Sequence, residues 1–280
     1  MPSRDAIPLH RRRQAALISH LAPPAHGVDP NKGTATLLLL GSGIRNDTCG
    51  HCHRDWFHYE SGELYLQVPA ADECRKDTDG PCSNCNSEAP KPYYPKTPAG
   101  GGRMIHIGNH YYDYSTGEKR YMGLRDRVEQ FFGIAPPGEQ AVGGYPMFQG
   151  NASNGVGSGA INRWVRKMCT AAGISKQERA NRLRKSLTPN MKENDDGEEV
   201  IDKTVAEMIA DNGTDSEGRP IPDVFAHDLR ATYCTQLCRC KNPNYTEIKR
   251  KTGHANEETL YRYVGYASDE LNPKEDANLF

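Results

Sequence analysis

The sequence lacks a long hydrophobic run and a secretory signal pattern. Its densest apolar patch, residues 37–40, is far shorter than the roughly 18 residues that a membrane-spanning helix requires. No apolar segment of the signal-peptide kind follows the arginines near the N-terminus. We therefore expect a cytoplasmic protein without a membrane partner. Its nine cysteines are then reduced thiols or metal ligands, because a disulfide framework belongs to secreted proteins.

An excess of basic residues is also missing, although it is usual in proteins that bind nucleic acids. The chain has 35 lysines and arginines against 36 aspartates and glutamates, which gives a net charge of -1. The basic residues nevertheless cluster at 11–13, 176–185 and 241–250, whereas acidic residues collect at 193–199 and after 269. The balance argues against a strongly basic binding protein but leaves room for one basic face.

Three further patterns are absent. There is no internal repeat, which argues against a repeat architecture. The glycine-rich residues 153–159 lack the Gly-Lys-Ser/Thr of a phosphate-binding loop, so we interpret them as a turn. The acidic residues do not form a group of the kind that binds the metal ions of a two-metal nuclease.

Helical periodicity is the most frequent pattern that is present. It predicts helices at residues 9–21, 34–40, 124–132 and around 161–169, with a short one near 201–209. Alternating apolar residues predict strands at 63–68 and 103–107.

One stretch, residues 225–264, carries most of the candidate chemistry. It contains His227 and Arg230 three positions apart, then His254, and Tyr263 nine residues after that. Side chains three positions apart on a helix point to one face, so His227 and Arg230 can act together. Two imidazoles, a guanidinium and a phenol at one place suit a phosphodiester that is attacked by tyrosine.

This stretch resembles the catalytic half of the tyrosine recombinases, the phage-type integrases. That family has His-x-x-Arg, Gly-His and a tyrosine nine residues later in this order, and the likeness extends over about residues 30–135 and 160–265. It implies an α+β fold that is mainly α-helical, with a small antiparallel β-sheet. We expect a single catalytic domain over 1–280, with insertions at about 70–95 and 175–222 and a tail at 265–280. Only 44 residues precede Arg45, so the family's N-terminal core-binding domain is expected to be absent.

The resemblance also implies roles for the charged residues. Arg45 follows an apolar helix in a Gly-x-Arg turn and matches the first of the two arginines that hold the scissile phosphate. Arg230 matches the second. Lys96, before a glycine-rich turn and a strand, matches the general acid, with Lys76 as its competitor. Thr48 stands where the family usually has an acidic residue, so the sequence does not identify the residue that orients the arginines.

The other three residues complete the implied site. His227 would accept the proton of the tyrosine, and His254 would bind the phosphate. Tyr263 would be the nucleophile that forms a 3′-phosphotyrosyl link to DNA, with Tyr261 as a neighbouring competitor. The plainer alternatives are a half-buried aromatic for Tyr263 and an ion-paired helix start with Asp228 for His227 and Arg230.

The function implied is site-specific recombination of double-stranded DNA, for integration or excision of a viral or other mobile element. The enzyme would act as a homotetramer on DNA, without a cofactor for catalysis, in the host cytoplasm if a virus encodes it. One alternative is a strand-passing enzyme similar to type IB topoisomerases. Another is a non-catalytic DNA-binding protein that zinc stabilises.

The cysteines form a second group of candidates. Cys82 and Cys85 have the spacing of a zinc knuckle, and with Cys74 they lie in a segment with few apolar neighbours. These three cysteines are therefore the candidate ligands of a structural zinc ion. The pair Cys49 and Cys52 has the same spacing but lies where the family has buried leucines, so core thiols are expected there. Cys234 and Cys238 are also expected in the core.

Overall fold

The computed structural model describes residues 8–9, 11–23, 26–76, 82, 85, 92–113, 117–141, 143–150, 154–174, 191–193, 199–201, 224–239 and 242–269. Its helices are α1 (Arg11–Leu21), α2 (Pro30–Ser42), α3 (Asn46–His51), η1 (Arg54–Trp56), η2 (Pro98–Gly100), α4 (Leu124–Phe132), α5 (Ser158–Ala171), α8 (Ala226–Cys238), α9 (Tyr245–Thr252) and α10 (Glu258–Asp269). Its strands are β1 (Phe57–Glu60), β2 (Glu63–Val68), β3 (Arg103–His106), β4 (His110–Asp113), β5 (Glu118–Tyr121), β6 (Met191–Glu193) and β7 (Glu199–Ile201). The predicted class, α+β and mainly α-helical, is confirmed.

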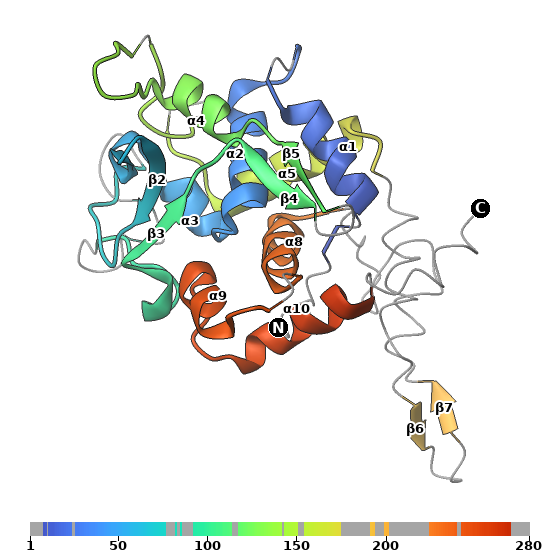
Figure 1. Ribbon diagram of the computed structural model, residues 1–280. Coiled ribbons are helices and arrows are strands. Elements are labelled where there is room, and N and C mark those ends of the chain that lie inside the picture. Colours follow the sequence, from blue (N-terminus) through green and yellow to red (C-terminus); the bar gives the residue numbers. More distant parts are fainter. Residues whose placement is uncertain are drawn as a thin grey trace.

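The central helix is α2, which contacts α4, α5 and α8 (Figure 1). It begins where the Asp29 side chain accepts a hydrogen bond from the backbone of Lys32 at 3.0 Å, with Pro30 in the first turn. It ends at Gly43, whose backbone is left-handed. The four leucines at residues 37–40 are all buried, as expected of a helix that is surrounded by other elements. These caps make α2 longer than the predicted 34–40.

The three-stranded sheet has the order β1-β2-β3, with antiparallel pairing throughout. Leu66 pairs with Phe57 on one side and Ile105 on the other, and all three side chains are buried. The strands predicted at 63–68 and 103–107 are confirmed within one residue. The β2–β3 connection, residues 69–102, contains the first predicted insertion.

Buried apolar side chains form two clusters that meet at α8. Ala226 and Leu229, in its first turns, belong to the large cluster that includes α1 to α5 and the sheet. Ala231, Cys234 and Cys238 belong to a smaller cluster with side chains of α9 and α10. Accordingly, α8 contacts α2 on one side and α9 and α10 on another (Figure 1).

Several elements differ from the prediction. The structure has β1 and the β4–β5 and β6–β7 hairpins as well, so the described residues form three small antiparallel sheets, not one. Ile201, expected at the start of a short helix, ends strand β7, and the other residues of that expected helix lie outside the described residues. The helix that carries Tyr263 continues to Asp269, so residues 265–269 of the expected tail at 265–280 are helical, and the rest of that tail lies outside the described residues. Among the described residues, no helix has the length and apolar character that a bilayer crossing needs.

Candidate functional site

Arg45 lies in the turn between α2 and α3. Gly43 ends α2 with φ +62°, and a Cβ at that position would collide with the ring of Tyr233. Ile44 is buried beneath the turn, and Arg45 is the N-cap of α3. Its Nη1 donates to Thr97 Oγ1 at 3.3 Å. Burial, together with the charge of Arg230, lowers the pKa of Arg45.

Arg230 connects the ends of two helices. Only 1% of it is exposed, and its Nη1 donates to the carbonyl of Gly43 at 2.5 Å. Its Nη2 donates to the carbonyl of Thr252 at 2.7 Å, and it lies 3.3 Å from His254 Nε2. The guanidinium of α8 therefore satisfies carbonyls at the C-terminal ends of α2 and α9, which fixes both ends around it.

His254 follows the left-handed Gly253 that ends α9. Its Nδ1 lies 2.6 Å from Thr252 Oγ1, and that hydroxyl already donates to the carbonyl of Ile248. Nδ1–H is therefore the donor to Thr252, and Nε2 accepts from Arg230. Burial, then the charges of Arg230, Arg45 and Arg103, lower the pKa of His254 to about 3, so the imidazole is neutral at pH 7.

Tyr263 lies beside this histidine. Its ring centroid is 5.6 Å from that of His254, and only 5% of the residue is exposed. The phenol is close enough to Arg45 to offset part of the lowering of the pKa of that guanidinium by burial and by Arg230. Its neighbour Tyr261, by contrast, is 60% exposed and contacts Tyr245. The helix α10 thus presents Tyr263, and not Tyr261, to the arginines.

His227 and Lys96 lie at the rim. His227 is exposed in the first turn of α8, near enough to His254 to contribute to its lowered pKa. Lys96 is exposed in the β2–β3 connection, one residue before the Thr97 that contacts Arg45. Asp228 caps α8, since its Oδ2 accepts from the backbone of Phe225 at 3.1 Å.

A third arginine belongs to this group, and the sequence interpretation gave it no role. Arg103, at the start of β3, is 5% exposed, and it donates to the carbonyls of Gly100 and Lys251, each at 2.8 Å. Burial and the charges of Arg230 and Arg45 lower its pKa to about 10. A signal was present, because an arginine follows the glycines of the Lys-Thr pattern at residues 96–103.

The three guanidiniums carry positive charge that no carboxylate of a described residue balances in an ion pair. Their hydrogen bonds go to carbonyls, to the Thr97 hydroxyl and, from Arg230, to His254 Nε2. The buried thiol of Cys234 is near them, but burial raises its pKa to about 11, so it stays neutral. Buried charges without a counter-ion are costly, and an anion between them would remove that cost.

A pocket of about 620 Å³ opens next to these residues, between η2, the start of β3, and α9. Its lining consists of Ala99, Gly101, Gly102, Arg103, Asn244, Thr246, Glu247, Lys249, Arg250 and His254. Arg103 and His254 thus lie at the junction of the pocket and the arginine cluster. Of the three guanidiniums, that of Arg103 lines the pocket.

Lys76, the competitor of Lys96 for the role of general acid, is buried. Only 3% of it is exposed, and its side chain packs against Gly50 of α3 and Gly155. It therefore lies in a separate place from Lys96, which is at the surface. Lys76 is buried because it packs against Gly50 and Gly155, and the composition of its own segment does not reveal these contacts.

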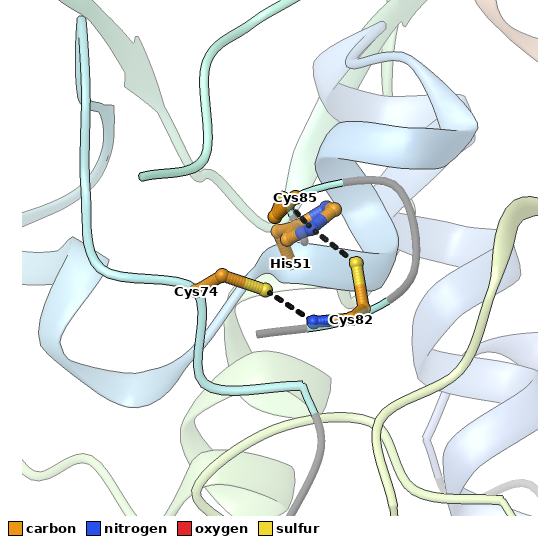
Figure 2. A group of neighbouring side chains, drawn as sticks. All are labelled: His51, Cys74, Cys82 and Cys85. Carbon is orange, nitrogen blue, oxygen red and sulfur yellow. Dashed lines mark hydrogen bonds between the residues drawn. The ribbon is translucent and has the colours of Figure 1, made fainter. Parts of the chain in front are cut away.

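The three candidate zinc ligands, Cys74, Cys82 and Cys85, come together, and all are buried. His51 of α3 joins them as a fourth group, with the four ligand atoms within 4.8 Å of one another (Figure 2). His51 is not one of the three ligands that the sequence predicts. Cys49, Cys52, Cys234 and Cys238 are buried free thiols, as expected for the core.

Comparison with known proteins gives one kind of match. Neither a family model nor a curated protein matches the chain. The fold is similar to that of the Tn1549 transposon integrase (residues 82–397) in complex with circular intermediate DNA, at 14% identity and a TM-score of 0.51. This match covers 100% of this chain and 69% of that one.

Two other solved structures give weaker scores. XerA recombinase matches at 12% identity over 100% of this chain and 67% of that one, with a TM-score of 0.48. A lambda integrase (residues 75–356) dimer bound to a core site matches at 12% identity over 94% and 61%, with a TM-score of 0.45. We base the fold assignment on the Tn1549 match, which alone of these three exceeds 0.5. The sequence resemblance is confirmed at the level of the fold: this chain has the fold of the tyrosine recombinases.

Proposed function

We propose that this chain is a site-specific tyrosine recombinase that cleaves and rejoins double-stranded DNA through Tyr263. One observation carries the proposal: three guanidiniums without a carboxylate partner among the described residues, at Arg45, Arg103 and Arg230, lie beside His254 and Tyr263. A phosphodiester supplies the missing anion, and the phenol lies next to it. Hydrogen bonds to a charged group contribute about 1.5–3 kcal/mol each, and more charge is present in the transition state.

The arginines stabilise the phosphate, because guanidiniums stay charged and bind two oxygens at once. Tyr263 Oη attacks the phosphorus, the bond to the 5′ oxygen breaks, and a 3′-phosphotyrosyl bond forms. His227 accepts the phenol proton, and Lys96 donates a proton to the departing oxygen. A 5′ hydroxyl of another strand then attacks the phosphotyrosyl bond, which reverses these proton transfers. The covalent link keeps the energy of the cleaved bond, so rejoining needs no ATP.

The biological context that we propose is integration or excision of a viral or other mobile element. The likeness to a transposon integrase that was solved with circular intermediate DNA supports it. Recombination exchanges strands between two DNA sites, so we propose a homotetramer with one chain for each cleaved strand, acting where the DNA is, in the cytoplasm.

The test uses a nicked suicide substrate, from which the strand beyond the nick diffuses away after cleavage. The wild-type chain should form a covalent adduct that is visible on a denaturing gel. Tyr263→Phe should form none and still bind DNA, because only the nucleophilic oxygen is lost. Tyr261→Phe is the matched control, since this exposed tyrosine on the same helix should leave the adduct unchanged.

Other outcomes separate the alternatives. An adduct in Tyr263→Phe that disappears in Tyr261→Phe would reassign the nucleophile. Absence of an adduct in the wild-type chain, with intact DNA binding, would favour the non-catalytic DNA-binding protein. Efficient relaxation of supercoiled DNA by a monomer, without strand exchange, would favour an activity similar to that of type IB topoisomerases.

A further inference from the structure

Four soft metal ligands converge from three separate segments of the chain. His51 ends α3, Cys74 follows β2, and Cys82 and Cys85 lie further along the connection between β2 and β3. His51 Nε2 lies 3.6 Å from Cys82 Sγ and 3.5 Å from Cys85 Sγ. Figure 2 shows the imidazole between these sulfurs, with Cys74 opposite.

The spacing fits one tetrahedral ion. Zinc binds cysteine sulfur at about 2.3 Å and histidine nitrogen at about 2.0 Å, so a tetrahedral site separates N and S by about 3.5 Å. The distances from His51 Nε2 to the sulfurs of Cys82 and Cys85 both agree with that value. Three thiolates and one imidazole are also a soft ligand set of the kind that structural zinc prefers.

The surroundings orient the ligands as a metal site requires. His51 Nδ1 donates to the carbonyl of Asp47 at 2.9 Å, which leaves the lone pair of Nε2 facing the sulfurs. The ring of Tyr93 stacks on the imidazole with centroids 4.2 Å apart. The backbone of Cys82 donates to Cys74 Sγ at 3.4 Å, a contact that favours a thiolate acceptor.

The position of Lys76 is compatible with such a site. It is buried, its side chain packs against Gly50 next to His51, and it forms an ion pair with no carboxylate of a described residue. A divalent ion with three thiolates carries a net charge of -1. Such a centre would be the counter-ion of the Lys76 ammonium, whereas three neutral thiols would leave this charge buried and uncompensated.

We propose that His51, Cys74, Cys82 and Cys85 bind one structural zinc ion, which holds the 70–95 insertion against α3. A segment with few apolar side chains cannot form a core of its own, and the ion replaces that core. Asp72 and Tyr93 close the same segment by two backbone hydrogen bonds of 3.0 and 2.7 Å.

The site also positions the catalytic candidates, a part of the inference that rests on the proposed function. Arg45 starts α3 and His51 ends it, so an ion at His51 fixes the helix whose N-cap is Arg45. Tyr93 donates to Thr48 of α3 at 2.9 Å and lies three residues before Lys96. A zinc ion at His51 would therefore stabilise α3, which begins after Arg45, and the segment that leads through Tyr93 to Lys96.

The first test measures metal in the full-length chain by elemental analysis after dialysis against EDTA. We expect about one zinc per chain, lost only with a thiol-reactive reagent or a stronger chelator. Cobalt exchange should give visible bands of a tetrahedral ion and a sulfur-to-cobalt charge-transfer band. Cys82→Ser and Cys85→Ser should lose the metal, and the metal-free chain should melt more than about 5 °C lower.

Two variants keep the test decisive where a serine variant fails to fold. His51→Cys preserves four ligands and should retain zinc, with a stronger charge-transfer band because a fourth thiolate joins. Cys52→Ala removes a buried thiol next to His51 that is outside the cluster, and should also retain zinc. Zinc loss in Cys52→Ala, a metal-free wild type with full thermal stability, or a disulfide between two of the three cysteines would each overturn the proposal.

Activity is measured separately. The zinc-free chain should give less covalent adduct on the suicide substrate than the zinc-loaded chain, and added zinc should restore it. Full adduct formation without zinc would refute the positioning role. If the zinc-loaded chain forms no adduct either, the recombinase proposal fails, while the metal measurement still decides the zinc site.

Discussion

At the scale of single residues, the candidate site is dominated by uncompensated positive charge. Burial and the charge of Arg230 lower the pKa of Arg45 and Arg103, and burial and all three arginine charges lower that of His254. The donors of the arginines are held by carbonyls, one hydroxyl and the His254 imidazole. The three guanidiniums are already held in place by these hydrogen bonds, which favours the binding of an anion. His254 is neutral in this state, and a bound phosphate would raise its pKa and give Nε2 a proton to donate.

His254 makes stability depend on pH. Its pKa is about 3 in the folded chain against 6.5 without the fold, so the unfolded chain binds more protons between these values. Stability should therefore rise with pH from about 3 to 6.5 and be lost as the pH falls through that window. Urea unfolding at pH 5.0 and 7.5 measures the difference. His254→Asn should show a smaller difference than the wild type, and an unchanged difference would contradict the assignment.

Lys96 and Lys76 can be separated chemically. A general acid is needed only for a poor leaving group, and a sulfur in place of the bridging 5′ oxygen leaves without a proton. Lys96→Ala should cleave native DNA about 10²–10⁴-fold more slowly and the sulfur-bridged DNA almost normally. Arg230→Ala should be slow on both, since the phosphate charge needs stabilisation in either case.

Buried Lys76 provides the contrasting variant. Lys76→Met should lower thermal stability or zinc affinity without sulfur rescue, because its side chain lies against α3 and not at the surface. Sulfur rescue of Lys76→Met, with none for Lys96→Ala, would transfer the role of general acid to Lys76.

At the scale of elements, two helix ends build the site. Both α2 and α9 end in a left-handed glycine, and Arg45 or His254 follows within two residues. Arg230 of α8 donates to a carbonyl at each of these ends. The glycines are required because the chain must turn sharply where other side chains pack closely.

Gly253 tests this requirement. An L-residue at its φ of +68° costs roughly 1–2 kcal/mol, and a Cβ there would also lie 2.9 Å from the Arg103 guanidinium. Gly253→Ala should therefore lose stability and most of its adduct yield on the suicide substrate. Gly62→Ala, at φ +81° with no atom within 4 Å of its Cβ, imposes the backbone strain alone and should keep the activity. Equal activity loss in both variants would show that strain, and not Arg103, is responsible.

At the scale of the whole molecule, the site lies on the seam between two apolar clusters. The larger cluster includes the buried Ile44 beside Arg45, and the smaller one includes Tyr263, while α8 carries Arg230 between them. Association of the two clusters therefore assembles the arginines with the tyrosine. The net charge of -1 does not conflict with DNA binding, because Lys249 and Arg250 line the pocket beside the arginines.

DNA binding by this chain should be weak and sensitive to salt, since few phosphates are neutralised. Arg250→Gln, at the pocket, should weaken binding to all sequences and reduce the slope of log K against log salt by about 1. Lys167→Gln, exposed on α5 and absent from the pocket lining, should leave the slope unchanged. Fluorescence anisotropy at four salt concentrations measures it. An equal effect of both changes would mean that the pocket is not the DNA path.

Helices and strands that bury one face could be predicted from the sequence, because their pattern of apolar residues is local. Periodicity predicted the helix at 124–132 and the strand at 63–68, because one buried face leaves a regular trace. The fold and the candidate site followed from the resemblance to the tyrosine recombinases, which the order and spacing of His227, Arg230, His254 and Tyr263 carry. The short strand β1 and the β4–β5 hairpin were not predicted, because their sequences show no alternation of apolar and polar residues.

Which side chains from distant parts of the sequence lie close together could be learned from the fold alone. His51 is 23 residues from Cys74 in sequence, yet its imidazole meets three sulfurs. Arg103 joins Arg230 because β3 and α9 pack together, and Lys76 is buried because Gly50 and Gly155 leave room for it. Burial and convergence depend on contacts between remote segments, and the sequence pattern of one segment carries no record of them.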